Sequence, residues 1–319
     1  MLRFLNRKTT IQWCLLIVLL MLTIYTVITQ SQLVYKEGSA FLFNSIALLF
    51  SKYKYFGKGI IITILILQIV LLQYYYKSNE YSAKKSLLPS IIFLSILLLT
   101  NSLSNISPCF FTLLFLLIIV SIDLSDTSSK IKNNVFWVGV MIALATCFDI
   151  SSIILLILVI ATLFINQFSR TKEIGILFFG FFLLYFYFFS YYFFMNNLNE
   201  WLLTFEKLKI SGILSCKIEN LHLTLISLVS LGFMYLFFIV KFKLIGDSKV
   251  VIHRNRIVSL NTRAIMMIAC IFLSNSSYPD ILGYLFIHIS IYLAMLAQEK
   301  SPLYINELIT IITLVALWL

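Results

Sequence analysis

The sequence predicts an all-α integral membrane protein that crosses the bilayer about eleven times. First, 61% of the 319 residues are hydrophobic and only 12% are charged, whereas about a quarter of a soluble domain is charged. Second, the mean hydropathy is +1.00. Third, the apolar residues fall in repeated long runs, and runs of about 18 or more residues are typical of transmembrane helices. Together these observations exclude a water-soluble core.

Short polar connectors separate the apolar segments. The segments lie at about Ile11–Ile28, Gly59–Tyr76, Leu87–Thr100, Pro108–Ile122, Val135–Phe148, Ile150–Asn166, Gly175–Met195, Leu221–Val240, Ala264–Ser274, Ile281–Ala297 and Tyr304–Leu319. Only Asp149 separates Val135–Phe148 from Ile150–Asn166. These two segments are therefore either a hairpin of two short helices or one long kinked helix. We expect a single transmembrane domain over residues 1–319, and a retained first helix rather than a cleaved signal peptide.

The distribution of basic residues predicts the orientation. With the N-terminus inside, cytoplasmic connectors hold seventeen of the 24 Lys and Arg residues, including every arginine. The alternation holds only if Asp149 is the tip of a hairpin. We therefore expect the N-terminus inside and the C-terminus outside, with a basic cytoplasmic loop at residues 241–263. The protein would lie in the bacterial cytoplasmic membrane.

Two predicted outer loops, residues 29–58 and 196–220, each hold an amphipathic stretch. Ala40–Phe56 is apolar with polar residues about one helical repeat apart, and Leu198–Lys209 carries an apolar stripe opposite charged residues. We expect both stretches to be interfacial helices that lie on the outer membrane surface. They would contact membrane lipids and protein partners.

Few ionisable residues are candidates for chemistry, and the outer side holds them. Glu37, Asp149 and Asp280 are the candidate catalytic acids, since all three fall in outer turns or loops. They could therefore lie together around one opening on the outer side of the bundle. The candidate ligands of a lipid phosphate are the lysines of the first outer loop, Lys36, Lys52, Lys54 and Lys58. An acid in a turn is often simply solvated or caps a helix, and these lysines can equally hold an interfacial helix against lipid.

The sequence contains no pattern typical of a metal or nucleotide site. Three histidines lie far apart, four of five cysteines fall in apolar segments, and there is no P-loop, GxGxxG or HExxH motif. We therefore expect no metal and no cofactor. The net charge of +11 comes from basic connectors between apolar segments, which set orientation, so we expect no nucleic acid partner.

The stretch from Asn101 to Trp201, about a third of the chain, resembles a family of bacterial multi-pass membrane proteins of unknown function. The features that carry the resemblance are the turn Ser107-Pro108, the helix start Phe136-Trp137-Val138-Gly139, the break at Asp149, the basic turn Arg170-Thr171-Lys172-Glu173, and the helix end Tyr191-Tyr192-Phe193.

The layout also resembles the GT-C superfamily of polyprenyl-phosphate-dependent glycosyltransferases. Members have a first helix, a long outer loop with interfacial helices, and short helix pairs further on. The resemblance implies an acidic motif in the first outer loop that acts as general base or holds a metal; here the matching acid is Glu37, and a second acid is missing.

The resemblance implies a role in envelope glycoconjugate or lipid-linked sugar metabolism. If the protein is an enzyme, it would be a glycosyltransferase with a polyprenyl-phosphate-linked donor. The alternative is a non-enzymatic membrane subunit or scaffold of an envelope complex. A transporter ranks third, because Gly- or Pro-broken helices repeated in two halves are only weakly indicated.

Overall fold

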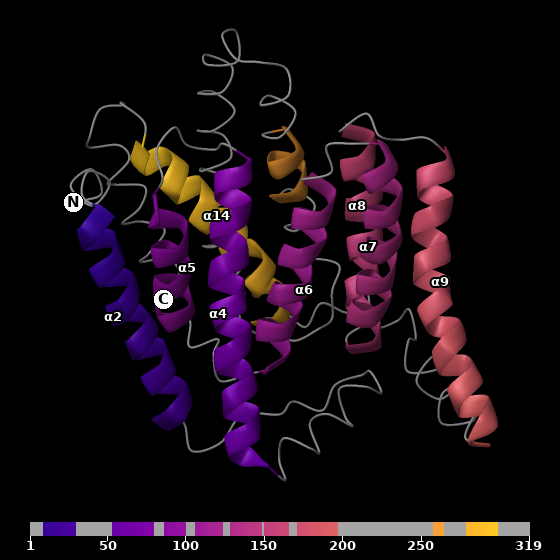
Figure 1. Cartoon of the computed structure of the whole chain (residues 1–319), viewed down its shortest axis with the longest axis horizontal. Helices are drawn as coiled ribbons and strands as arrows, with labels where there is room; N and C mark the ends of the chain where they lie inside the picture. Colours follow the sequence, from indigo (N-terminus) through magenta and orange to yellow (C-terminus); the bar gives the residue numbers. More distant parts are fainter. Residues whose placement is uncertain are drawn as a thin grey trace, which may run out of the picture.

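The described part of this computed structural model is a bundle of helices, and it contains no strand (Figure 1). The described residues are 9–29, 53–79, 86–99, 106–123, 128–148, 150–165, 171–196, 258–264 and 279–298. The predicted segments Leu221–Val240 and Tyr304–Leu319, and the predicted interfacial helix Leu198–Lys209, lie outside these residues.

Most predicted apolar segments that fall in the described residues are helices with nearly the expected bounds. The helices are α2 (Thr9–Thr29), α4 (Lys54–Ser78), α5 (Leu88–Leu99), α6 (Ile106–Asp123), α7 (Ser128–Phe148), η2 (Ile150–Ile153), α8 (Ile154–Ile165), α9 (Thr171–Phe194) and α14 (Pro279–Gln298). Residues 258–264 are also helical, so helix is present within the predicted basic loop, before the segment predicted from Ala264.

Three of the described helices are long and apolar enough to cross a membrane, namely Thr10–Thr29, Tyr55–Ser78 and Thr171–Phe194. The other apolar helices among the described residues are shorter, such as Leu88–Leu98 and Cys109–Asp123. The all-α class is thus confirmed for the described part of the chain. The number of eleven spans and the membrane orientation stay predictions.

The start of α4 differs from the sequence prediction. We expected residues 40–56 to form an interfacial helix and the first outer loop to reach residue 58, but α4 already begins at Lys54. The amide of Gly57 donates to the carbonyl of Tyr53 at 3.1 Å, so the helix runs on through Gly57 and Gly59. Glycine costs a helix about 1 kcal/mol relative to alanine, and tertiary packing routinely outweighs that cost.

Hydrogen bonds between helices define two ends of the bundle. The upper end is the end that carries Gln12, Ser86 and Asp123 (upper in Figure 1), and the lower end is the end that carries Ile28 and Lys58. Gln12 at the start of α2 bonds the amide of Leu87 before α5 at 2.8 Å, and Gln73 near the end of α4 bonds the carbonyl of Ser86 at 2.7 Å. α2 and α4 are therefore antiparallel.

The chain turns back between α7 and α8, as the hairpin interpretation requires. Phe136 and Thr146 of α7 contact Phe179 and Tyr185 of α9, so residue numbers rise in the same direction along both helices. Because α7 and α9 are parallel, the segment of η2 and α8 that joins them must run in the opposite direction. One long kinked helix over residues 135–166 is thereby ruled out.

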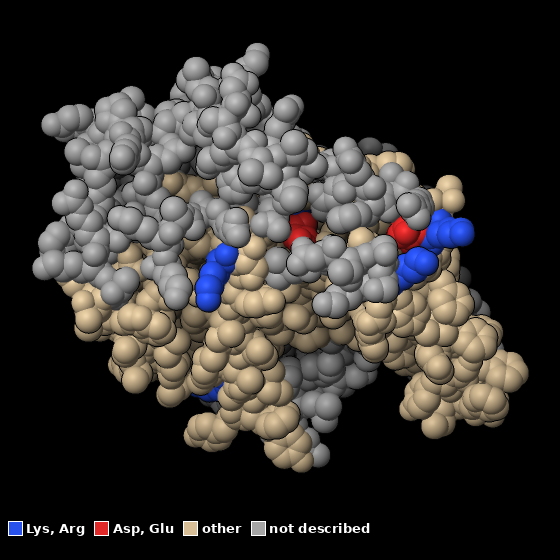
Figure 2. Space-filling model, turned by 45° about the horizontal axis from the view of Figure 1, so that its top comes forward, with Lys and Arg blue, Asp and Glu red and all other residues tan. Residues whose placement is uncertain are grey.

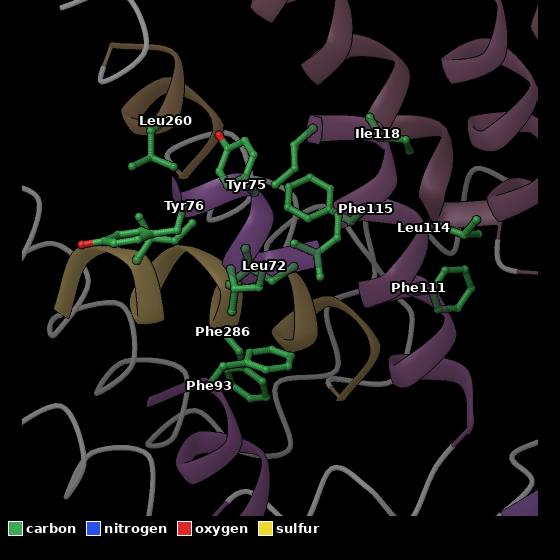
Figure 3. Close-up of a cluster of buried hydrophobic side chains, with 14 of the residues drawn as sticks. Leu72, Tyr75, Tyr76, Phe93, Phe111, Leu114, Phe115, Ile118, Leu260 and Phe286 are labelled. Atoms are coloured by element: carbon green, nitrogen blue, oxygen red, sulfur yellow. The ribbon is translucent and has the colours of Figure 1, made fainter. Parts of the chain in front are cut away.

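One buried apolar core joins α4, α5, α6 and α14. Figure 3 shows Leu72, Tyr75 and Tyr76 of α4 beside Phe286 of α14 and Phe93 of α5, with Phe115 of α6 close by. α14 packs against α5 and α6 and crosses the bundle obliquely (Figure 1). The described helices thus share one continuous apolar core.

Two glycines let α7 and α9 approach closely. A Cβ atom at Gly139 would lie 2.2 Å from the carbonyl oxygen of Leu177, and one at Gly180 would lie 2.3 Å from the carbonyl oxygen of Phe136. Small residues are the usual means by which membrane helices reach backbone contact. The close approach of this pair therefore depends on the absence of side chains at both positions.

We expect Gly180→Ala to lower the free energy of unfolding by about 1–3 kcal/mol, because the added methyl group forces the α7 and α9 backbones apart. Thermal unfolding of the detergent-solubilised full chain measures the change. Gly175→Ala is the matched control, since a Cβ atom there meets no atom within 4 Å. Equal stability losses for the two variants would contradict the packing account.

Candidate functional site

A charged cluster is buried at the upper end of the bundle. The guanidinium of Arg263 donates from Nη2 to Oδ2 of Asp123 at 2.5 Å, and the two side chains are 1% and 2% exposed. The hydroxyl of Tyr75 donates to the same carboxylate oxygen at 2.6 Å. Three elements far apart in sequence thus meet at one carboxylate.

Local sequence explains the position of each group. Asp123 is the last residue of α6 and follows the apolar run that packs into the core. Tyr75 lies in the last turns of α4, where its ring is buried and its hydroxyl faces the end of α6. The Arg263 side chain is fixed against the preceding helical turn, because Nε donates to the carbonyl of Ser259 at 3.1 Å and Nη2 donates to the Ser259 hydroxyl at 2.6 Å.

The same short helix is also bonded to α14. The hydroxyl of Tyr292 donates to Oδ1 of Asn261 at 2.6 Å. One turn earlier on α14, the ring of His288 lies 5.6 Å from the ring of Phe115 of α6 and is fully buried. Residues 258–264 therefore make side-chain hydrogen bonds or ion pairs with α6 and α14, and Tyr75 of α4 shares their carboxylate.

The main effect of the cluster is to fix which elements lie next to one another, because its contribution to net stability is small. A buried ion pair gains strong attraction but loses the hydration of both charges, so it contributes little net stability. Removal of one partner leaves the other charge buried and costs several kcal/mol. Oδ1 of Asp123 is buried and accepts no hydrogen bond, so the carboxylate depends on Arg263 and Tyr75. The cluster thus requires that 258–264, α4 and α6 meet in one arrangement.

The structure describes few of the predicted site residues. Glu37, Asp149, Lys36 and Lys52 lie outside the described residues. Lys54 and Asp280 lie in the first turns of α4 and α14, where only the backbone is described. These residues stay predicted members of a site.

Lys58 is the one predicted phosphate ligand whose side chain the structure describes. It is 7% exposed, and its ammonium donates to the carbonyl of Ile28 in the last turn of α2. An amine near a helix C-terminus satisfies a carbonyl that lacks an intrahelical partner. Lys58 therefore joins the end of α2 to the start of α4, and its contact with a phosphate stays a prediction.

The backbone places the surroundings of the predicted acids at the lower end. α7 starts near the end of α6, where Asn134 donates to the carbonyl of Ser121 at 3.0 Å, so Phe148 at its far end lies about 20 Å lower. α14 crosses the bundle obliquely towards Asn261 (Figure 1), so its first turn with Asp280 lies about 18 Å from Tyr292 along the helix axis, away from the upper end. Thr29 and Tyr53, the described residues that flank the first loop, lie at the lower end.

Charged side chains are scarce on the described surface, and their distribution is uneven. Figure 2 shows most of the blue and red atoms in a band near the upper end, above a broad face of other residues, with one blue patch near the lower edge. Within the described ranges, no group of three or more His, Cys, Asp or Glu side chains could hold a metal ion.

Sequence reasoning missed Asp123 and Tyr75, and assigned Arg263 only to membrane orientation. A usable signal was present: Asp123 directly ends one apolar run and Arg263 directly precedes another, and both were expected on the cytoplasmic side. Opposite charges at the same depth of a bundle are expected to pair.

No protein-family model, curated protein or solved structure matches this chain.

We expect Arg263→Ala to destabilise the bundle by about 3–5 kcal/mol, because the Asp123 carboxylate is left buried without its cation. Denaturant titration in detergent, followed by tyrosine and tryptophan fluorescence, measures the loss. Lys132→Ala removes an exposed charge on α7 and should stay within about 0.5 kcal/mol of the parent. A loss for Arg263→Ala as small as that of the control would show that the pair does not position these elements.

Proposed function

We propose that this chain is a multi-pass protein of the bacterial cytoplasmic membrane with a GT-C-like layout, which binds a polyprenyl-phosphate lipid at its lower end and acts in lipid-linked sugar metabolism of the envelope. The observation that carries the proposal is positional. The described residues that flank Glu37 and Asp149 lie at the lower end of the bundle, and Asp280 begins α14 at the end of that helix that points away from the upper end. A site built from segments that are far apart in sequence requires these segments to lie on the same side of the bundle.

The membrane assignment is supported by the alternation of the apolar helices. α2 and α4 are antiparallel, and α7, α8 and α9 alternate in direction. In both groups, successive helices of the described part run in opposite directions, as a protein that crosses a bilayer repeatedly requires. The predicted orientation would put the lower end outside.

The predicted chemistry is phosphate binding together with general base catalysis. Lysines at a membrane surface attract anionic groups; Lys36 and Lys52 belong to the predicted first outer loop, and Lys54 begins α4. Glu37 would take the proton of an acceptor hydroxyl as that oxygen attacks the sugar carbon, and the lipid phosphate would leave with the bonding electron pair. The step needs one carboxylate near the donor and no metal.

A scaffold is the second candidate function, and α9 favours it. Its exposed face carries aromatic rings along most of its length, among them Phe182, Phe186 and Phe193. Phe178 stacks on Phe182 and Phe189 stacks on Phe193, with ring centroids 6.3 Å apart in both pairs. This face can pack against lipid or against another subunit of an envelope complex, and it requires no catalysis.

A measurement of membrane topology tests the predicted orientation, on which the outer position of the proposed site depends. In a chain with single cysteines, an impermeant maleimide added to intact cells should label Cys216 but not a cysteine at position 254, because residues 196–220 are predicted outside and residues 241–263 inside. The reverse pattern of labelling would overturn the orientation and, with it, the outer position of the predicted site.

Lipid binding and turnover test the site itself. We expect Lys52→Gln with Lys54→Gln to weaken binding of polyprenyl phosphate to the full chain in nanodiscs about tenfold or more, since each lysine contributes about 1 kcal/mol to attraction of an anionic headgroup. Native mass spectrometry measures the affinity. Glu37→Gln should retain binding and abolish sugar transfer from a polyprenyl-phosphate-linked donor.

Lys132→Gln is the matched control for this experiment, because it removes an exposed lysine from α7, near the upper end. The lysine double variant and the control should differ clearly in affinity. If both bind polyprenyl phosphate like the parent, the lipid-phosphate site is wrong. If Glu37→Gln transfers sugar normally, Glu37 is not the general base. If the lipid binds but the parent itself transfers no sugar, the scaffold function is favoured.

A further inference from the structure

We propose that a row of phenylalanines on α9 is the surface through which two copies of this chain pair in the membrane. The row consists of four exposed rings on the side of the helix that faces away from α7, namely Phe182, Phe186, Phe189 and Phe193. The proposal uses neither the predicted lipid site nor the predicted orientation, because two copies in one membrane share their orientation in either case. It therefore stands or falls independently of the proposed function.

α9 has two opposite faces. Its buried side chains, Leu177 and Phe181 among them, pack against α7, and Gly180 lets the two backbones approach closely. A helix advances about 100° per residue, so Phe182 lies about 160° around the helix axis from Gly180. The row therefore points away from α7. Figure 1 shows α9 at the edge of the bundle, beyond α7 and α8, where a second copy can reach it.

The row differs from the outward face of α2, another helix long enough to cross a membrane. Lipid tails accept apolar side chains of any shape, so contact with lipid requires no particular residue type. α2 follows this expectation, whereas the row on α9 repeats one bulky ring at steps of four, three and four residues. The exposed side chains of α2 at the same steps are of four kinds, Cys14, Val18, Met21 and Tyr25.

Packing between rings supplies an attraction that lipid tails do not match. The hydrophobic effect does not act between helices in a bilayer, so their association depends on close packing and specific contacts. Aromatic pairs attract one another beyond their area burial. Phe178 already stacks on Phe182 and Phe189 on Phe193, with ring planes 20° and 24° apart. Because neighbours hold these rings in place, less side-chain freedom is lost when a second copy binds.

The face is complementary to itself. The charged residues of α9 are Lys172 and Glu173 in its first turn, so no like charges meet along the row. A two-fold axis perpendicular to the membrane makes the two α9 helices parallel and brings each ring close to the same ring of the second copy. Steps of four and three residues are those of a coiled-coil seam, in which two helices pack at about 20°.

The exposed area is large enough for a stable pair. The row and the flanking rings of Phe178 and Phe179 are each 37–64% exposed. Taking about 200 Å² for a fully exposed ring, this face offers roughly 600 Å² per copy. Two copies together offer roughly 1,200 Å², and a specific interface buries about 1,000 Å² or more. Phe179 also contacts the ring of Phe136 at 6.1 Å, which ties the upper end of the face to α7.

Disulfide formation between copies tests the interface. Single cysteines are placed at positions 182, 186 and 189 of the row, or at position 187, in the full chain with its five native cysteines replaced by alanine. Isolated membranes are treated with an oxidant, and the rate of dimer formation is followed on non-reducing gels. Phe186 and Tyr187 are adjacent and both 63% exposed, so they differ chiefly in direction. We expect Phe186→Cys to crosslink about tenfold faster than Tyr187→Cys, because a disulfide needs Cα atoms within about 7 Å.

Loss of the rings tests their contribution. We expect Phe182→Ala with Phe186→Ala to lower the association constant of the full chain in liposomes about tenfold or more, since ring pairs at the centre of the row are lost. Energy transfer between labelled copies measures association over a series of protein-to-lipid ratios. Tyr187→Ala with Tyr191→Ala is the matched control, because it removes two exposed rings of the same helix outside the row. The control should associate like the parent.

The proposal is overturned if cysteines at 186 and 187 crosslink at equal rates, which indicates random collision, or if no position of the row crosslinks. Crosslinks from the row to a different membrane protein also overturn it, since the face then binds another subunit. If Phe186→Cys does not fold, positions 182 and 189 decide. Crosslinks confined to the row, in a chain that binds no polyprenyl phosphate, support the interface although the proposed function fails.

Discussion

The buried ion pair between Asp123 and Arg263 is the interaction on which the arrangement of the upper end depends. It joins residues 140 positions apart in the chain, and Tyr75 completes it from a third element. Apolar surfaces in a bundle of this composition match one another in many registers, because Leu and Ile occur on every α-helix labelled in Figure 1. A buried charge accepts only one partner arrangement, so the pair gives the apolar core its specific alignment.

Other polar contacts repeat this principle at smaller scale. Gln12, Gln73 and Ser86 join α2, α4 and the start of α5 through buried amide hydrogen bonds. Gln68 donates to the carbonyl of Cys109 from within the core. A polar group in an apolar environment must be satisfied, and each such bond fixes a neighbour. Between α7 and α9 the glycines Gly139 and Gly180 add a steric constraint, since the close approach admits no side chain.

Much of the fold could be predicted from the sequence because apolar length is a strong signal. The bounds of α2, α5 and α6 follow the apolar runs, and the alternation of basic connectors along the chain indicated the hairpin at Asp149. The start of α4 could not be predicted in this way, since Lys54 and the two glycines nearby read as a loop. The Asp123–Arg263 contact escaped prediction for another reason: pairing across the chain depends on tertiary placement, which composition does not encode.

The two ends of the bundle now have distinct physical characters. The upper end holds a buried charge pair that joins residues 258–264 to α6, whereas the lower end holds the junction of α2 and α4 on either side of the predicted first loop. Alternating helices connect the two ends, so a change in packing at one end could reach the other through α4, α6 or α14.

A double-mutant cycle on Asp123 and Arg263 tests the central claim most directly. The free energy of unfolding is measured in detergent for the parent, Asp123→Ala, Arg263→Ala and the double variant. If the pair aligns the upper end, the double variant should lose far less stability than the sum of the single losses, with a coupling energy of about 1.5–3 kcal/mol. Additive losses, with a coupling energy below about 0.5 kcal/mol, would show that the two side chains act independently and would contradict the account.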